Sequence, residues 1–520
     1  MSADASDWIA HHALWSPDKV AVIDLHSSRR FSYAEFNRRC DRLASFFTGE
    51  CVVGPGDRVG VLAYNSTDIF EVQFACPKVG AIFVPLNWRL AEAELGAIVA
   101  DAGLRVLIYG PEFEELAVAL AGRVPGLRLV SVRDGAPSDY EAGIAAAAPL
   151  GRTPRPSYDD VWTIMYTSGT TGRPKGVQIT YGMVTFSAVN GMMKGGVSAL
   201  SNGLTFLPLF HVGGLYLMAG FIFHAGGTNV VMRSFDPARA LEVLADPALR
   251  ISHVFGVPTN FLMMMQSECF STADLSGVEC LLVGGAPCPV SILEAYAAKS
   301  VQVRQAWGMT ETTTIGTMLS AEKAAEKIGS SGLPVMHAQL RIEDQDGNEV
   351  AVGEVGQLAI RGPTVTPGYW RNPAETERAF RDGWFLTGDA AWADADGFIT
   401  IVDRWKDMYI SGGENVYPAE IEDVLHRMPG ILSAAVIGIP DPRWGEVGCA
   451  YVVADAGADV SETAVRAHFE ASLARYKLPA QVRFIDALPL TAAGKVSKSD
   501  LRRLYAKSAS APGAQETRHS

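Results

Sequence analysis

The stretch Tyr166–Val177 reads YTSGTTGRPKGV and directly follows a short β-rich run, Val161–Met165. Glycine permits a close backbone approach to a ligand, while hydroxyl groups and a lysine supply hydrogen-bond donors and positive charge. The glycines are Gly169, Gly172 and Gly176, the hydroxyls belong to Thr167, Ser168, Thr170 and Thr171, and the cation is Lys175. This combination predicts a loop that binds a polyphosphate. The alternative is a flexible surface turn, which rarely needs so many donors.

Two common phosphate-binding patterns do not describe this loop. Neither G-x-x-x-x-G-K-[ST] nor G-x-G-x-x-G can be placed on residues 166–177. The stretch is therefore neither a Walker A loop nor a dinucleotide-binding turn.

Around this loop, short apolar runs alternate with helical patterns. The runs are near-continuous, as expected for strands that are buried on both faces of a sheet. The strands are predicted at Lys19–Ile23, Val59–Leu62, Val106–Tyr109, Val161–Tyr166, Leu204–Leu207 and Leu281–Val283, and helices between them at Asp236–Leu244 and Val290–Ala298. The alternation predicts an α/β fold with largely parallel sheets.

Two changes of pattern predict the domain organisation. Turn signals at Asp346-Gly347-Asn348 and Asp396-Gly397 indicate hairpins in a small β subdomain, about residues 338–403. It closes a large N-terminal domain, residues 1–403. A small α+β C-terminal domain follows at 404–505, with helices at Ala419–His426 and Glu462–Leu473. The polar tail, residues 506–520, is predicted to be flexible.

The composition limits the class of protein. The 520 residues are 48% apolar and 19% charged, close to the average of globular proteins. The net charge of −13 argues against a nucleic-acid-binding protein. Seven cysteines without CxxC spacing, and no signal-peptide pattern, favour a reducing cytoplasm. The stretch between Lys194 and Arg233 has no charged residue, but Pro208 and two histidines interrupt it. We therefore expect buried core and pocket wall there, not a membrane span.

The loop sequence and several later motifs resemble the adenylate-forming enzymes, which include acyl-CoA synthetases, nonribosomal-peptide adenylation domains and firefly luciferase. The motifs occur in the family's order over roughly residues 10–505. They are YTSGTTGRPKGV, Phe210-His211, Gly284-Gly285-Ala286-Pro287, Trp307-Gly308-Met309-Thr310-Glu311, Thr387-Gly388-Asp389, Asp403-Arg404-Trp405-Lys406-Asp407 and Gly494-Lys495.

This resemblance implies a two-step reaction. A carboxylate first attacks the α-phosphate of ATP, which gives an acyl adenylate and pyrophosphate. A thiol then attacks the acyl carbon and releases AMP. Both steps develop negative charge, which fixed donors and cations would stabilise.

The resemblance also implies a nucleotide site. Trp307, Gly308 and Met309 would lie along the adenine, with Gly285, Ala286 and Pro287 nearby, and Thr310 would contact the α-phosphate. The family usually has tyrosine where this chain has Trp307, so stacking is kept and the phenol oxygen is lost. Glu311 and Thr167 would bind Mg²⁺, which prefers oxygen ligands. An isolated glutamate is more often a solvated surface acid, but its motif favours the metal site.

Further site residues are implied in the second half of the chain. Asp389 and Arg404 would bind the ribose, although Arg404 could instead form an interdomain salt bridge. Lys495 would bridge the attacking carboxylate and the α-phosphate; the alternative is a solvated lysine. His211 would lie near the acyl carboxylate, unless it is a core histidine.

The thiol step would use another face of the small domain. Lys406 occupies the family's hinge position, and Gly412 and Gly413 would line a tunnel for pantetheine, although alone they would indicate a turn. Trp444, Arg475 and Lys477 would contact the CoA nucleotide by stacking and charge.

No carrier-protein motif follows Lys495, so we expect a ligase that uses free CoA; loading of a carrier protein is the alternative. Small, apolar or Met-rich segments are expected to line the acyl pocket. They are His211–Leu215, Phe255–Thr259, Met263–Met265, Gly284–Ala286 and Met309–Thr313. They favour a medium- or long-chain fatty acid, with a hydroxycinnamate such as ferulate, or a benzoate, close behind. A monomer or homodimer is expected, and peripheral membrane contact stays open.

Overall fold

The structure is a computed structural model, and it describes most of the chain. The described residues are 4–148, 150, 154–167, 174–286, 288–405, 407–411, 414–455, 457–458, 460–491 and 496–509; for 404, 410, 414, 415, 471 and 509 only the main chain is described. Ten predicted site residues lie outside these ranges: Ser168, Gly169, Thr170, Thr171, Gly172, Pro287, Lys406, Gly412, Gly413 and Lys495. Most of the predicted tail also lies outside.

The chain forms two compact units. The first consists of Met1–Gly285, Ile292–Leu340 and Ile360–Leu386, and the second of Ala286–Ser291, Arg341–Ala359 and Thr387–Ser520. The domain boundaries predicted at residues 403–404 and 505–506 stay predictions.

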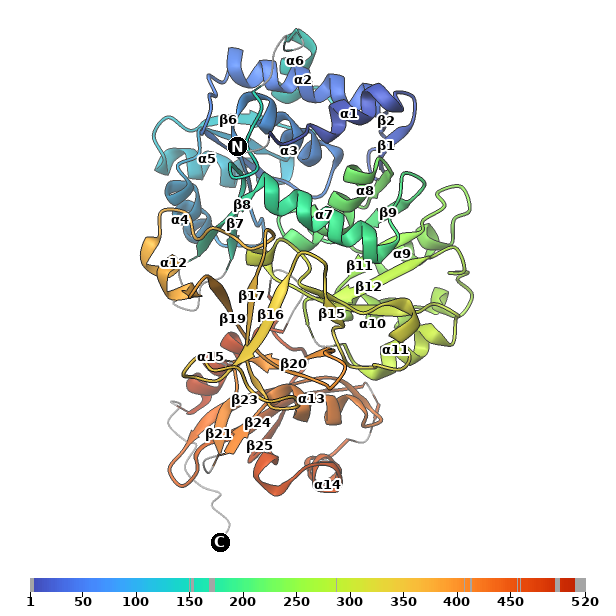
Figure 1. Cartoon of the computed structure of the whole chain (residues 1–520), viewed down its shortest axis with the longest axis vertical. Helices are drawn as coiled ribbons and strands as arrows, with labels where there is room; N and C mark the ends of the chain where they lie inside the picture. The colour runs from blue at the N-terminus through green and yellow to red at the C-terminus, as the bar shows by residue number, and fades with distance from the viewer. Residues whose placement is uncertain are drawn as a thin grey trace. The chain divides into compact units, whose positions relative to one another are not determined.

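A nine-stranded sheet in the first unit has the order β15-β14-β13-β12-β11-β9-β10-β1-β2 (Figure 1). Six neighbouring strands, from β13 to β1, are parallel, and the strands beyond them at both edges are antiparallel. The strands are β1 (Val20–Asp24), β2 (Arg30–Ser32), β9 (Asn202–Thr205), β10 (Thr228–Val231), β11 (His253–Gly256), β12 (Cys280–Gly284), β13 (Val303–Trp307), β14 (Thr317–Met318) and β15 (Leu333–Pro334).

A six-stranded sheet in the same unit has the order β6-β5-β3-β4-β7-β8, in which only β8 is antiparallel. Its strands are β3 (Arg58–Leu62), β4 (Ile82–Pro85), β5 (Val106–Tyr109), β6 (Arg128–Ser131), β7 (Val161–Thr167) and β8 (Lys175–Thr180). The predicted α/β fold is thus confirmed. The predicted strand Leu204–Leu207 is observed two residues earlier, as β9.

Helices connect most of these strands. They are α1 (Trp8–Trp15), α2 (Tyr33–Gly49), α3 (Thr67–Val79), α4 (Glu92–Ala102), α5 (Glu114–Arg123), α6 (Asp139–Ala146), α7 (Tyr181–Gly195), α8 (Met218–Ala225), α9 (Pro237–Ala245), α10 (Pro258–Gln266), α11 (Val290–Ala297) and α12 (Pro373–Ala379). Local sequence sets their ends. For example, Ser32 and Glu35 form a reciprocal cap at the start of α2, which satisfies backbone N–H groups that have no partner within the helix.

The uncharged stretch after Lys194 is mostly interior from Ser201 onwards, as predicted, whereas Leu200 is exposed. It forms β9, a π-helical turn (Gly213–Leu217), α8 and β10, and side chains such as Leu215, Phe221 and Val230 are almost fully buried. Among the described residues, no helix is both long enough and apolar enough to cross a membrane.

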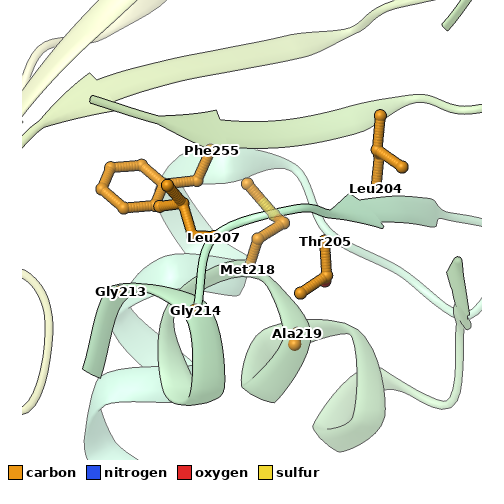
Figure 2. A pocket seen from close by; sticks show the side chains of 8 residues that line it. All are labelled: Leu204, Thr205, Leu207, Gly213, Gly214, Met218, Ala219 and Phe255. Atoms are coloured by element: carbon orange, nitrogen blue, oxygen red, sulfur yellow. The ribbon is translucent and has the colours of Figure 1, made fainter. Parts of the chain in front are cut away.

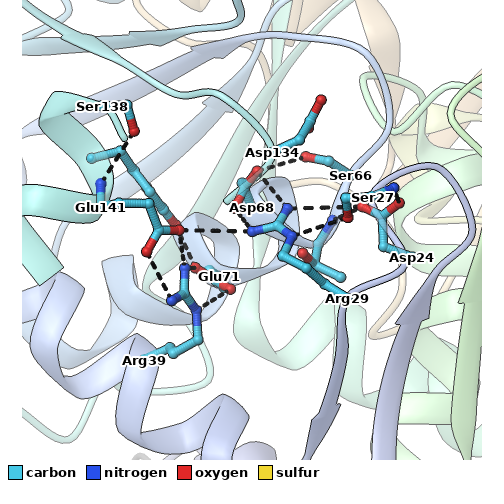
Figure 3. A network of polar contacts seen from close by, with 12 residues as sticks. Asp24, Ser27, Arg29, Arg39, Ser66, Asp68, Glu71, Asp134, Ser138 and Glu141 are labelled. Atoms are coloured by element: carbon cyan, nitrogen blue, oxygen red, sulfur yellow. Dashed lines mark hydrogen bonds and ion pairs between the residues drawn. The ribbon is translucent and has the colours of Figure 1, made fainter. Parts of the chain in front are cut away.

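A buried ionic network joins α2, α3 and α6 (Figure 3). Arg39 on α2 makes two hydrogen bonds to Glu71, which has no exposed side-chain area, and two to Glu141. Arg29 pairs in the same way with Asp68, at 2.7 and 2.8 Å. Bidentate pairing of this kind lets charged side chains stay buried, so the network fixes how these helices pack.

Five strands between residues 339 and 404 form a further sheet, in the order β16-β17-β19-β18 with β20 beside β19. The strands are β16 (Gln339–Glu343), β17 (Gly356–Arg361), β18 (Phe380–Arg381), β19 (Trp384–Ala393) and β20 (Ile399–Arg404). The predicted hairpin at Asp396-Gly397 joins β19 to β20.

From Tyr409 onwards, the described part of the second unit is an α+β fold. It contains a sheet in the order β22-β21-β24-β23, with β25 beside β24. The elements are β21 (Tyr409–Ser411), β22 (Glu414–Val416), α13 (Pro418–His426), β23 (Ile431–Asp441), β24 (Gly445–Ala454), α14 (Glu462–Ser472), β25 (Gln481–Phe484) and α15 (Lys498–Ala509). The predicted helices α13 and α14 are therefore confirmed. All seven cysteines of the chain are free thiols.

Candidate functional site

Several predicted site segments follow neighbouring strands of the nine-stranded sheet. The strands β9, β11, β12 and β13 are adjacent and parallel, so their carboxyl ends meet at one edge. Residues 206–211 follow β9, residues 285–286 follow β12, and residues 308–311 follow β13. Ligands of open α/β sheets commonly bind at this edge.

The loop after β13 has a constrained backbone. A Cβ atom on Gly308 would lie 1.5 Å from the carbonyl oxygen of Thr314, so only glycine fits there. Beyond the short helical turn Thr310–Thr312, Thr313 and Thr314 both have positive φ angles, 45° and 91°. Such angles are costly for β-branched residues, and Ser187 holds them in place by contacts to the Thr313 carbonyl and the Thr314 hydroxyl. Strain of this kind is common at functional sites.

Glu311 lies in this loop and is largely buried, with 7% of the residue exposed. Its Oε1 accepts a hydrogen bond of 3.0 Å from the hydroxyl of Tyr369. Its carbonyl oxygen accepts a further bond of 2.8 Å from the N–H of Thr366. The burial and these bonds make Glu311 an oriented carboxylate, not a freely solvated surface acid.

Lys175 is the first residue of β8, and it pairs with Thr167, the last residue of β7. Its Nζ forms an ion pair with Glu375, and it lies 5.4 Å from the centre of the Tyr369 ring. The hydrogen bond from Lys175 holds the pKa of Glu375 below its usual value. The hydroxyl of Thr167 points back to the Lys175 carbonyl oxygen at 3.5 Å. Together these contacts fix both ends of the phosphate loop.

Tyr369 and Glu375 were not predicted from the sequence. Tyr369 pairs with Val177 of β8 in an isolated antiparallel bridge. Trp370 N–H donates to the Gly176 carbonyl oxygen at 2.7 Å. No local pattern marks these residues, because their roles depend on contacts with segments about 200 positions away.

Trp307 ends β13 and is 7% exposed. A Cβ atom on Gly316 would lie 2.5 Å from the indole ring, so one face of Trp307 packs closely on that backbone. The side chain is thus held rigidly at the carboxyl edge. Gly285 and Ala286, which follow the neighbouring strand β12, are exposed there.

His211 lies beyond β9, with its ring 4.6 Å from that of Phe210, which in turn contacts Trp88. The adjacent turn borders a small apolar pocket of about 10 Å³ (Figure 2). Its lining is Leu204, Thr205, Leu207, Gly213, Gly214, Met218, Ala219 and Phe255. Gly213, Gly214 and Phe255 come from segments predicted to line an acyl pocket.

In the second unit, Asp389 lies opposite Arg404 in the pairing of β19 with β20. Asp389 is 5% exposed, and its N–H donates to the hydroxyl of Thr387 at 3.1 Å. The two residues predicted to bind a ribose are thus brought together by strand register.

The three predicted CoA contacts also lie in the second unit. Trp444 is about half exposed and stacks with the guanidinium of Arg443 at 4.8 Å. Arg475 and Lys477 share one short helical turn. Lys477 forms an ion pair with Glu420 at 2.6 Å, so its charge is already partly neutralised.

Comparison with known families agrees with these features. The family model described as AMP-binding enzyme matches residues 9–370, and the model of the AMP-binding enzyme C-terminal domain matches residues 420–495. The chain therefore belongs to the adenylate-forming superfamily of AMP-binding enzymes, as an acyl-CoA synthetase.

Individual relatives cover nearly the whole chain. A feruloyl-CoA synthase of Amycolatopsis sp. is 40% identical over 96% of this chain and 98% of its own length. The long-chain-fatty-acid–CoA ligase FadD13 of Mycobacterium tuberculosis is 37% identical over 96% of this chain and 97% of its own. The ATP-bound crystal structure of MatB from Rhodopseudomonas palustris matches with a TM-score of 0.90 at 30% identity, covering 96% of this chain and 99% of that one.

Proposed function

We propose that this enzyme joins an apolar monocarboxylic acid to free CoA, with ATP consumed to form an acyl adenylate. The observation that carries the proposal is the shared edge of β9, β12 and β13. His211 follows β9, and the loop that bears Thr310 and Glu311 follows β13; the two parallel strands lie in one sheet with β11 and β12 between them. A carboxylate bound beside His211 would thus lie at the same edge of the sheet as a nucleotide bound along residues 307–311.

The residues of the first unit fit a magnesium ion bound together with the nucleotide. Glu311 is a buried, oriented carboxylate and Thr167 is a hydroxyl at the end of β7, and both are hard oxygen donors. Within the described part of the chain, no three His, Cys, Asp or Glu side chains gather into a metal site of their own. Oxygens of the nucleotide phosphates would therefore complete the coordination. Bound there, Mg²⁺ would neutralise phosphate charge.

The chain's own cations act on the phosphates. Lys175 and the residues of the loop Ser168, Gly169, Thr170, Thr171 and Gly172 bind the β- and γ-phosphates. Thr310 and Lys495 bind the α-phosphate, where negative charge develops as the carboxylate attacks. Asp389 and Arg404 bind the ribose hydroxyls, and Trp307, Gly308 and Met309 lie against the adenine together with Gly285, Ala286 and Pro287.

The second step uses the C-terminal domain. Rotation about Lys406 withdraws Lys495 and brings in Gly412 and Gly413, which leave space for a pantetheine arm. Trp444, Arg475 and Lys477 contact the nucleotide part of CoA. Since Lys477 already pairs with Glu420, we expect it to contribute less than Arg475.

The acid is proposed to be a hydroxycinnamate such as ferulate. Among the residues that the structure describes, no lysine or arginine lines the apolar pocket beside residues 211–215, so a second carboxylate would be unpaired there. At about 10 Å³ the pocket has room for roughly one water, so its size does not select among apolar acids. A hydroxycinnamate is supported instead by the feruloyl-CoA synthase of Amycolatopsis sp., which is 40% identical over 96% of this chain. A medium- or long-chain fatty acid is the second candidate, because FadD13 covers nearly the whole chain at 37% identity.

Free thiols at all seven cysteines agree with a reducing cytoplasm, which we propose as the compartment. A monomer or homodimer is proposed as the working form.

Pyrophosphate release across a panel of acids tests the proposal. The panel runs from acetate to palmitate and includes benzoate, coumarate and ferulate, each with ATP and Mg²⁺, with and without CoA. CoA-stimulated turnover with ferulate or coumarate is expected. Turnover only with fatty acids would replace the proposed acid, and turnover that CoA does not stimulate would indicate a carrier-protein acceptor.

A further inference from the structure

We propose that Tyr369 is a positioning residue. Its hydroxyl orients the carboxylate of Glu311, and its ring holds the ammonium of Lys175. The inference rests on the proposed function, in which Glu311 binds the metal and Lys175 binds phosphate. Neither the motifs nor the composition pointed to Tyr369.

The hydroxyl of Tyr369 determines where Glu311 points. It donates to Oε1 at 3.0 Å, and both side chains are buried, with exposures of 9% and 7%. A buried hydrogen bond to a charged group is among the stronger ones. One carboxylate oxygen is therefore oriented by the protein before a metal arrives.

The ring of the same tyrosine determines where Lys175 lies. Lys175 Nζ is 5.4 Å from the ring centre, within the range of a cation–π contact, and it also forms an ion pair with Glu375. Glu375 is itself placed at the start of α12, where its N–H donates to the Asn372 side chain at 3.2 Å. The ammonium is thus held at the start of β8, where phosphate oxygens would replace part of its pairing.

The backbone of Tyr369 is held as firmly as its side chain. Its N–H donates to Thr376 Oγ1 at 2.9 Å, and the residue pairs with Val177 on β8. The preceding Gly368 has φ of 143°, and a Cβ there would lie 2.4 Å from Thr376. Tyr369 therefore cannot shift without moving β8 or the start of α12.

One consequence separates positioning from general structural support. The Tyr369→Phe variant removes the hydroxyl from Glu311 but leaves the ring under Lys175. Metal binding should weaken, whereas metal-free ATP binding should not. A general loosening of the fold would weaken both.

The test uses the full-length protein and Mn²⁺ as a probe visible by electron paramagnetic resonance. We expect Tyr369→Phe to raise the dissociation constant of Mn²⁺ in the ATP complex about 5- to 10-fold. The dissociation constant of ATP in the presence of a chelator should stay within about 2-fold. Tyr33→Phe is the matched control, because the Tyr33 hydroxyl is equally buried and donates to the Gly227 carbonyl oxygen at 2.7 Å, away from Glu311.

Unchanged Mn²⁺ affinity in Tyr369→Phe, or an equal loss of Mn²⁺ and ATP affinity, would overturn the proposal. If that variant does not fold, Thr376→Val supplies the same comparison, since it removes the oxygen that holds the Tyr369 N–H. Failure of the wild-type protein to bind Mn²⁺ with ATP would instead contradict the proposed function. The two failures are therefore distinguishable.

Discussion

Asp389 and Arg404 face each other directly across the antiparallel strands β19 and β20. Asp389 lies in the middle of β19 and Arg404 is the last residue of β20, and the Asp396-Gly397 turn joins the two strands. The pair is thus assembled by a hairpin, within one short segment of the chain.

Replacing Asp389 by asparagine should weaken ATP binding through the ribose. An ionised carboxylate accepts from both ribose hydroxyls, whereas an amide presents one acceptor and one donor group. We expect the KM for ATP to rise about 10-fold, and the preference for ATP over 2′-deoxyATP to shrink. Pyrophosphate release with both nucleotides measures this. Asp396→Asn, in the exposed turn of the same hairpin, is the control and should leave the KM for ATP and the nucleotide preference unchanged. If Asp389→Asn kept the wild-type preference for ATP over 2′-deoxyATP, Asp389 would be excluded from the ribose site.

Replacing Glu375 by glutamine should tighten ATP binding. The substitution removes a negative charge next to Lys175, where the phosphates of a polyanion would bind. We expect the dissociation constant to fall about 3-fold at low salt, with a smaller change at high salt because of screening. Calorimetric titration at two ionic strengths measures both.

Arg378→Gln is the control for this charge effect. Arg378 also pairs with Glu375, but its side chain is 69% exposed, so its loss should hardly alter ATP binding. A weaker affinity for ATP in Glu375→Gln would show that the carboxylate holds Lys175 in its binding position and does not compete with phosphate.

Lys495→Ala should abolish adenylation but largely spare the thioester step. The lysine is proposed to neutralise charge only while the carboxylate attacks the α-phosphate. Pyrophosphate exchange measures the first step, and CoA consumption from supplied acyl adenylate measures the second. Gly413→Leu should show the opposite pattern, with adenylate formed and CoA blocked. Equal loss of both steps in Lys495→Ala would contradict a two-conformation mechanism.

Arg39→Ala should strongly destabilise the first unit. It would leave Glu71, with no exposed side-chain area, and Glu141 without the guanidinium that now bonds both. Uncompensated buried charge costs about 3–5 kcal/mol, which corresponds to a fall of about 10 °C in Tm. Differential scanning calorimetry measures the change. The control, Arg239→Ala, breaks the exposed pair with Glu242 and should change Tm by no more than about 1 °C. If Arg39→Ala also changed Tm by so little, the ionic network would contribute little to stability.

His224 should make the protein less stable in mild acid. Burial lowers the pKa of His224 to about 4 from an ordinary value of 6.5. Between these values the unfolded chain binds more protons than the folded one, so the stabilising contribution is complete above pH 6.5 and is lost as the pH falls towards 4. The loss is at most about 3 kcal/mol. As the pH is lowered from 7 to 4.5, the Tm of His224→Phe should fall less than the Tm of the wild type. The control, His26→Gln at an exposed site, should show the same fall in Tm as the wild type.

Much of the framework could be predicted from local sequence. Val106–Tyr109 is the strand β5 to the residue, and the helices at residues 418–426 and 462–472 begin or end within one residue of prediction. These segments are continuous apolar runs or strongly periodic, so local pattern and burial agree. The strand predicted at Leu204–Leu207 shows the limit of local sequence. The observed strand, β9, begins two residues earlier, because its pairing with β10 and β11 determines which residues are in the strand.

The site was only partly predictable. Lys175 was indicated by the glycine- and hydroxyl-rich loop around it, and Glu311 by the resemblance of its motif to the adenylate-forming enzymes. Tyr369 could not be identified, because its significance arises from an antiparallel bridge to Val177 and a hydrogen bond to a loop 58 positions away. The strained backbone at Thr313 and Thr314 was also unforeseen, since threonine ordinarily signals the opposite conformational preference.

The strained pair restricts which residues positions 313 and 314 can accept. Glycine would adopt either positive φ without cost, but it would remove a buried threonine side chain, and at position 314 also the hydroxyl that contacts Ser187. Backbone strain and buried contacts therefore oppose each other at this loop, and the contacts keep the backbone next to Glu311 in one conformation.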